Sequence, residues 1–116
     1  MSARDDKADL LQGTLDMLIL KTLEDQPLHG YAIAQRIEQT SRALLHVPQG
    51  SLYPALHRLE NRGWLSANWV ETDGGRAAKV YRLTARGRRQ LEQELADWRR
   101  LSEAIGWILH VERAAP

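Results

Sequence analysis

The sequence contains no cysteine and no long run of apolar residues in its 116 positions. Without cysteine the chain can form neither a disulfide framework nor a thiolate metal site. No apolar run approaches the roughly 18 residues that a membrane-spanning helix needs. Residues 1–9 are polar and mixed in charge, and they lack the apolar segment of a secretory signal. We therefore expect a cytoplasmic protein that begins with a flexible tail over residues 1–9.

Patterns typical of enzymes and metalloproteins are missing as well. Ser51, His57 and Asp73 are residue types found in nucleophilic triads, but Ser51 does not lie in a Gly-x-Ser-x-Gly elbow. The four histidines have no metal-ligand spacing: they are His29, His46, His57 and His110. We therefore predict that the protein is not an enzyme, that it has no metal site and that it uses no cofactor.

The net charge of +1 hides an uneven distribution of charge. Residues 49–89 hold eight basic and three acidic side chains, a net charge of +5. Residues 1–48 and residues 90–116 each have a net charge of −2. A polyanion would be attracted to the middle of the chain and not to its ends. Charge alone fits an ordinary solvated surface equally well.

The strongest helix signal lies at residues 49–60, with the sequence Gln-Gly-Ser-Leu-Tyr-Pro-Ala-Leu-His-Arg-Leu-Glu. Ser51 suits the N-cap, because its hydroxyl can accept a hydrogen bond from a free first-turn N–H. Pro54 then falls in the first turn, where its missing N–H costs nothing. Gly63 suits a left-handed C-terminal cap. Leu52, Leu56 and Leu59 form an apolar stripe, and the polar side chains off this stripe are Tyr53, His57 and Arg58.

Two helices are predicted before this stretch. Apolar spacing indicates a helix over residues 10–24, which Pro27 ends, and another from about residue 29 or 30 to Ser41. The first helix is apolar on two sides and needs cover on both. After Gly63, residues 64–70 and 77–83 are typical of strands, and a turn signal at Thr72–Arg76 joins them into a hairpin.

A last helix is predicted from Ala85, capped by Thr84, to about Val111. Its residues at alternating spacings of four and three form a heptad seam: Leu91, Leu95, Trp98, Ser102, Ile105, Leu109 and Glu112. A helix of that length exceeds what a small domain can cover, so we expect a homodimer. The alternative is pairing with the first helix of the same chain. The expected dimer interface comprises Leu11, Leu15, Leu91, Leu95, Trp98, Ile105 and Leu109.

This order of elements predicts a mostly α fold with a small β hairpin, a winged helix-turn-helix followed by a long C-terminal dimerisation helix. Residues 10–84 would form the DNA-binding domain and residues 85–112 the dimerisation helix. In this fold the later helix of the pair, here Ser51–Gly63, is the recognition helix. It enters the major groove with its N-terminal end at the base edges, and the hairpin lies beside the duplex. The expected DNA-binding residues are Gln49, Gly50, Ser51, Tyr53, Pro54, His57, Arg58, Arg76 and Lys79. Arg58 is expected on a guanine edge or a phosphate, although Tyr53 could instead belong to the core.

The stretch at residues 49–60, followed by Gly63, resembles the recognition-helix signature of PadR-type transcriptional regulators. Residues 28–33 (Leu-His-Gly-Tyr-Ala-Ile) resemble the start of their second helix, and residues 81–87 (Tyr-Arg-Leu-Thr-Ala-Arg-Gly) resemble the entry to their last helix. The resemblance covers about residues 10–110. It implies a homodimeric repressor of the short subclass, with the last helix used for dimerisation. The wing has Arg76-Ala77-Ala78-Lys79-Val80 where the family commonly has two or three basic residues.

Trp98 lies on the expected dimer seam. The resemblance implies that a tryptophan in this place can stack on a planar aromatic compound, and two symmetry-related copies could hold a flat ring between them. Alternatively, Trp98 simply fills the dimer core. The expected partners are double-stranded DNA with a near-palindromic operator, a second copy of the chain and a small aromatic effector. The alternative function is a protein-interaction module that uses the winged helix and the heptad helix without DNA.

Overall fold

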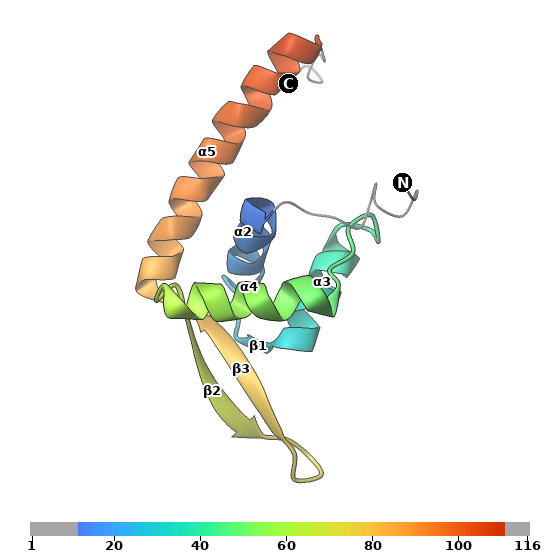
Figure 1. Cartoon of the computed structure of the whole chain (residues 1–116), viewed down its shortest axis with the longest axis vertical. Helices are drawn as coiled ribbons and strands as arrows, with labels where there is room; N and C mark the ends of the chain where they lie inside the picture. The colour runs from blue at the N-terminus through green and yellow to red at the C-terminus, as the bar shows by residue number, and fades with distance from the viewer. Residues whose placement is uncertain (1–11, 111–116) are drawn as a thin grey trace.

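A computed structural model describes residues 12–110 of the chain (Figure 1). The expectations for the tail at residues 1–9 and for Leu11 lie outside the described residues. The elements in chain order are α2 (Gln12–Thr22), β1 (Leu28–His29), α3 (Gly30–Thr40), α4 (Gln49–Asn61), β2 (Leu65–Glu71), β3 (Ala77–Leu83) and α5 (Ala85–Leu109). This order confirms the predicted mostly α fold with a hairpin and a long last helix.

The sheet has three strands and not two, because the two-residue strand β1 adds to the predicted hairpin. The strand order is β1-β3-β2, and both pairs are antiparallel. Leu28 of β1 pairs with Tyr81 of β3, and Leu65 of β2 pairs with Leu83. A strand of two residues is too short to show an alternating pattern, so the sequence carried no signal for it. The third strand ties the hairpin to the start of α3.

The core lies where α2, α3 and α4 meet the sheet and the first turns of α5. The predicted leucine stripe of α4 is confirmed, since its three leucines are almost completely buried. The largest fully buried side chains come from four helices: Ile19, Leu20, Ile33, Leu52, Leu56, Leu59 and Leu91. Burial of this stripe leaves the opposite side of α4 facing solvent.

The start of α4 differs from the prediction. The helix begins at Gln49, and its N-cap is Pro48, which makes no side-chain cap. Ser51 is therefore the third helical residue, and Pro54 lies inside the helix beyond the first turn. Pro54 lacks the N–H that would bond the carbonyl of Gly50 one turn earlier. The first helical turn is stabilised instead by hydrogen bonds from the N–H groups of Ser51 and Leu52 to the carbonyl of Pro48.

The end of α4 and the start of α5 are joined by the two caps that the sequence predicts. Gly63 has a φ of 79°, and Trp64 N–H donates to the Leu59 carbonyl at 3.1 Å, as in a Schellman motif. The hydroxyl of Thr84 accepts a hydrogen bond from Gly87 N–H at 2.9 Å and donates one to the Gly63 carbonyl at 2.7 Å. The end of the recognition helix is thus fixed to the start of α5.

Figure 1 shows two parts of the chain that project from the core in opposite directions. The β2–β3 hairpin extends below α4, and α5 rises past α2 and continues beyond it. The overall extents are 54 × 36 × 26 Å. The far half of α5 therefore has few neighbours within its own chain.

Candidate nucleic-acid interface

The side of α4 that faces solvent is polar and carries small residues at its N-terminal end. Gly50, Tyr53, Pro54, His57 and Asn61 are all exposed and recur at spacings of three and four, so they share one face. Gln49 and Ser51 are exposed at the start of the helix. Glycine, serine and proline allow a close approach to a duplex, and the polar side chains offer donors and acceptors to base edges.

Asn61 was not among the residues that the sequence analysis selected. It lies four residues after His57 and is exposed on the same face of α4. An asparagine can form two hydrogen bonds with an adenine edge. The helical spacing from His57 was the signal that would have identified it.

Tyr53 serves both the core and the exposed face. The side chain is 44% exposed. Its ring lies against Gly30, where an added β-carbon would come within 2.8 Å of a ring carbon. The close contact between α3 and α4 therefore depends on the tyrosine ring and the glycine together. Because its ring is held by α3, Tyr53 has a fixed position at the surface.

A recess of about 340 Å³ lies between the start of α3, the N-terminal half of α4 and the hairpin. Four of its lining residues are aromatic, and Tyr31 and Trp69 among them are well exposed. It is lined by His29, Gly30, Tyr31, Tyr53, Trp69, Thr72, Ala78, Lys79 and Tyr81. Aromatic rings with a nearby cation suit a sugar-phosphate backbone. Sequence reasoning did not place Tyr31 and Trp69 here, because the recess joins segments that are far apart in the chain.

Arg58 lies elsewhere than the sequence analysis expected. Its guanidinium donates to the Asp16 carboxylate on α2 at 2.6 Å, and the Asp16 side chain is 6% exposed. The Nε atom of Arg58 is buried and has no hydrogen-bond partner among the described residues. The arginine is therefore turned toward α2, and its guanidinium is paired there and not extended into solvent.

The two basic residues of the hairpin differ from each other. Lys79 donates to the Glu60 carboxylate of α4 at 3.1 Å and lies over the Tyr81 ring, 5.4 Å from its centroid. The hydrogen bond to Glu60 raises the pKa of Lys79 above its ordinary value. Arg76 is exposed at the tip of the hairpin, and within residues 12–110 its guanidinium has no ionic partner. Lys79 is thus held against α4, while Arg76 is available to a phosphate.

The expected dimer residues fall into two groups. Leu15 and Leu91 are buried in the core of their own chain, and Leu95 packs against that core. The structure thus corrects the expectation for Leu15 and Leu91, because side chains that their own chain covers have no apolar surface left for a partner. The large apolar side chains exposed on α5 are Trp98, Leu101, Ile105, Trp107, Ile108 and Leu109.

An open cleft of about 500 Å³ lies between the start of α2 and the middle of α5. Trp98 forms part of its wall, together with Met17 of α2 and the carboxylates of Glu94 and Asp97. Its full lining is Gly13, Thr14, Met17, Glu94, Asp97, Trp98, Leu101 and Ile105. The walls of the cleft are mainly apolar, and its two acidic side chains already have partners: Asp97 accepts from Gln93 and is paired with Arg100, and Glu94 accepts from Gln90.

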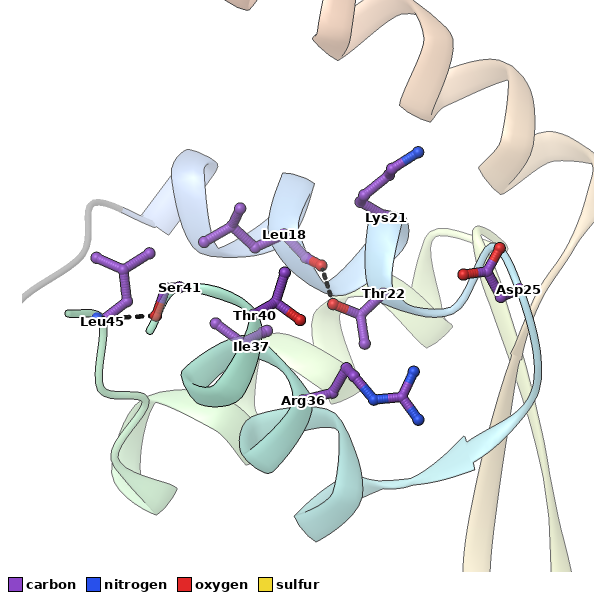
Figure 2. Close-up of a pocket in the computed structure, with 9 residues that line it drawn as sticks. All are labelled: Leu18, Lys21, Thr22, Asp25, Arg36, Ile37, Thr40, Ser41 and Leu45. Carbon is purple, nitrogen blue, oxygen red and sulfur yellow. Dashed lines mark hydrogen bonds between the residues drawn. The ribbon is translucent and has the colours of Figure 1, made fainter. Parts of the chain in front are cut away.

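A separate groove of about 260 Å³ lies between α2, α3 and the segment that follows α3 (Figure 2). Two of its three hydroxyls already have partners: Thr22 donates to the Leu18 carbonyl at 2.7 Å, and Ser41 accepts from Leu45 N–H at 3.0 Å. Figure 2 shows the charged ends of Lys21 and Arg36 pointing away from each other. These side chains do not converge on a common point, so we assign no ligand to the groove.

Residues 12–110 contain no cluster of three histidine, aspartate or glutamate side chains that could hold a metal ion. Among the helices of the same residues, none has the length and apolar character needed to cross a membrane.

Helices α2, α3 and α4, followed by an antiparallel hairpin beside the polar face of α4, define a winged helix-turn-helix. In proteins of this class the later helix of the pair enters the major groove of DNA. The model of the PadR-like transcriptional regulator family matches residues 19–93, and the chain belongs to that family. Members of this family are DNA-binding regulators and not enzymes, which agrees with the absence of a catalytic pattern in the sequence.

Individual relatives support the same assignment. Transcriptional regulator Rv3488 of Mycobacterium tuberculosis is 41% identical over 76 residues, which cover 66% of this chain and 67% of the relative. The crystal structure of a PadR family transcriptional regulator from Eggerthella lenta superposes with a TM-score of 0.75 at 32% identity, covering 87% of this chain and 86% of that one. A transcriptional regulator from Clostridium thermocellum gives a TM-score of 0.76 at 26% identity, covering 82% and 92%.

Proposed function

We propose that the protein is a homodimeric repressor that binds a near-palindromic operator and leaves it when a small planar effector or another signal arrives. The observation that carries this proposal is the uncovered apolar surface on the far half of α5, in a chain that also presents a polar recognition helix. A second copy that covers α5 would place two α4 helices in one assembly. In this proposal residues 10–84 bind DNA and residues 85–112 form the dimer.

In this proposal the exposed polar face of α4 reads the bases. Gln49, Ser51 and His57 supply hydrogen-bonding groups, and Gly50 and Pro54 let the helix approach the groove. Asn61 adds a side chain that suits adenine. The phosphate backbone lies in the aromatic recess beside Tyr31 and Tyr53, and Arg76 contacts the backbone or the minor groove.

The dimer would use the exposed apolar residues on one side of α5. Trp98, Leu101, Ile105 and Ile108 recur at spacings of three and four and are exposed in the single chain. A contiguous apolar surface of this kind is typical of an interface between subunits. Because the two copies of α5 determine the separation of the two α4 helices, dimer geometry controls whether both half-sites bind together.

The cleft beside Trp98 is the proposed effector site. The indole face suits a planar ring, and a positive charge on that ring would be attracted to the indole and to the carboxylate of Glu94, whose hydrogen-bond partner Gln90 is neutral. A molecule bound there would lie between α2 and α5 and could change the dimer geometry. The alternative role of Trp98 is packing against the partner subunit.

Selection of duplexes from a random library, followed by footprinting of the winning sequence, tests the operator proposal. We expect enrichment of a near-palindrome with half-sites about one helical turn apart, because each copy of α4 reads one half-site. Flat enrichment would reject specific binding and favour the protein-interaction module. An asymmetric footprint would reject the symmetric dimer.

Trp98→Ala tests the effector proposal. Planar aromatic cations that quench the tryptophan fluorescence of the wild-type protein should lose this effect in the variant, because the stacking ring is gone. Trp69→Ala is the matched control, since it removes an exposed tryptophan of the hairpin that does not line the cleft. Quenching that persists in Trp98→Ala would place the ligand elsewhere.

A further inference from the structure

Two charged residues of the recognition helix form ion pairs within their own chain. Arg58 pairs with Asp16 of α2 at 2.6 Å, and Glu60 pairs with Lys79 of β3 at 3.1 Å. The first pair is largely buried, and both side chains of the second are about one third exposed. Both pairs therefore connect α4 to neighbouring elements and lie outside its exposed polar face.

The two pairs hold opposite sides of α4. Positions 58 and 60 are two residues apart, which is about 200° around a helix of 3.6 residues per turn. One side of the helix is thus attached to α2 and the other to the hairpin. Leucine packing alone is not directional, whereas a charge-assisted hydrogen bond fixes both distance and direction. Rotation of α4 about its axis would have to lengthen one of the pairs.

Small rotations of this helix matter for base recognition. A helix with its side chains has a radius of about 5–6 Å, so a rotation of about 10° moves the side-chain tips by about 1 Å. A shift of that size takes most hydrogen bonds to base edges out of range. Attraction to phosphates depends much less on position, because it acts over a Debye length of about 10 Å.

We propose that Arg58 is a positioning residue, which acts on DNA through Asp16 by fixing the rotation of α4 and does not itself contact the duplex. The proposal rests on the operator binding proposed above. The buried pair is the stronger of the two constraints, because breaking it leaves a charge without a partner in a poorly solvated place. Asp16, which lies on α2 outside the recognition helix, becomes a determinant of operator specificity.

Asp16→Asn distinguishes positioning from direct contact, because the two roles predict opposite changes in the affinity for DNA. If Arg58 is a positioning residue, the variant binds the selected operator on the order of tenfold more weakly, equivalent to the loss of one good base contact. Its affinity for an unrelated duplex stays within about twofold, since phosphate attraction is kept. If Arg58 reaches DNA, the variant frees the guanidinium and removes a negative charge, so both duplexes bind more tightly. Asp25→Asn is the matched control, an exposed aspartate in the segment after α2.

Arg58→Gln adds a second readout that loss of structure would not change. A direct phosphate contact contributes about 0.9 to the slope of log affinity against log salt concentration, and Arg58→Gln would remove that contribution. A positioning arginine leaves the slope unchanged while the affinity for the operator falls. A slope that falls by about 0.9 overturns the proposal.

The double variant Asp16→Asn with Arg58→Gln keeps a hydrogen-bonding pair and leaves no unpaired charge. We expect its operator affinity to exceed that of either single variant, and multiplied losses would overturn the proposal. All variants are first checked by thermal unfolding, because a partly unfolded sample loses affinity for both duplexes in the same proportion. If the wild-type protein selects no duplex at all, the operator proposal fails, and this failure is visible before any variant is measured.

Discussion

Leu91 and Ile108 both lie on α5, yet Leu91 is completely buried and Ile108 is 74% exposed. The near half of the helix packs on α2 and the sheet, while the far half extends beyond the rest of the chain (Figure 1). The two halves of this helix therefore differ in environment. The near half is part of a core that its own chain covers, and the far half presents an apolar surface to solvent. In the dimer proposed above, the partner would cover the far half alone, and this can be tested by changing each half separately.

The largest effect is expected at the junction of α5 with the body of the protein. Gly87 lies so close to Trp64 that an added β-carbon would overlap the Trp64 carbonyl oxygen and would come within 2.8 Å of Leu83. Gly87→Ala must therefore displace the first turn of α5, at a cost of about 3 kcal/mol or more in the free energy of unfolding. Urea unfolding followed by circular dichroism measures this cost.

Gly13→Ala is the control for this change, because a β-carbon at Gly13 has nothing within 4 Å in the chain. It should leave the free energy of unfolding unchanged or raise it slightly through better helix propensity. Equal unfolding midpoints for the Gly87→Ala variant and the wild type would show that the near half of α5 is not part of the core.

The second largest effect is expected on the association of two chains through the far half of α5. Ile105→Asp places a charge in the apolar surface that we assign to the dimer, so the molar mass in light scattering should fall toward the 13.2 kDa of one chain. The loss in association should be about 2–5 kcal/mol, as for an unpaired charge in an interface. The helix content should be kept, because Ile105 is 43% exposed in the single chain.

Trp107→Asp provides the matched control on the same helix. Trp107 is also exposed and apolar, but two residues correspond to about 200° around the helix, so it lies on the side opposite to Ile105. The same aspartate there should leave the molar mass of the wild type unchanged. A monomer produced by both variants would mean that α5 is covered on all sides and would remove the one-sided interface.

Most of the fold follows from local patterns in the sequence. The strand Ala77–Leu83 and the start of α5 at Ala85 were predicted at the observed residues. The caps at Gly63 and Thr84 were predicted correctly because glycine and threonine act there through short-range hydrogen bonds. The N-cap of α4 was placed three residues late, since Ser51 is a good capping residue in isolation while the chain turns at Pro48.

The candidate site was less predictable, because its geometry depends on contacts between distant residues. Arg58 and Asp16 are 42 residues apart in the chain, and no local pattern shows which arginine of an amphipathic helix is turned inward. Strand β1 and the aromatic recess arise in the same way, from segments that meet after folding. Leu15 and Leu91 carry the same heptad and stripe signals as exposed residues, so periodicity could not separate the core of one chain from an interface between two.

The smallest expected effect is a loss of thermal stability at high pH, and it arises from two residues of β3 and not from the far half of α5. Tyr81 lies on β3 next to β1 and is buried, and this burial raises its pKa above the ordinary value near 10. The hydrogen bond to Glu60 likewise raises the pKa of Lys79. Both groups stabilise the fold fully below their unfolded pKa values, and this stabilisation is lost as the pH rises through the higher folded values. The melting temperature should therefore fall by a few degrees between about pH 9 and pH 11. Tyr81→Phe removes the tyrosine contribution and should flatten this dependence, whereas parallel curves for the two proteins would show that Tyr81 ionises equally in the folded and unfolded states.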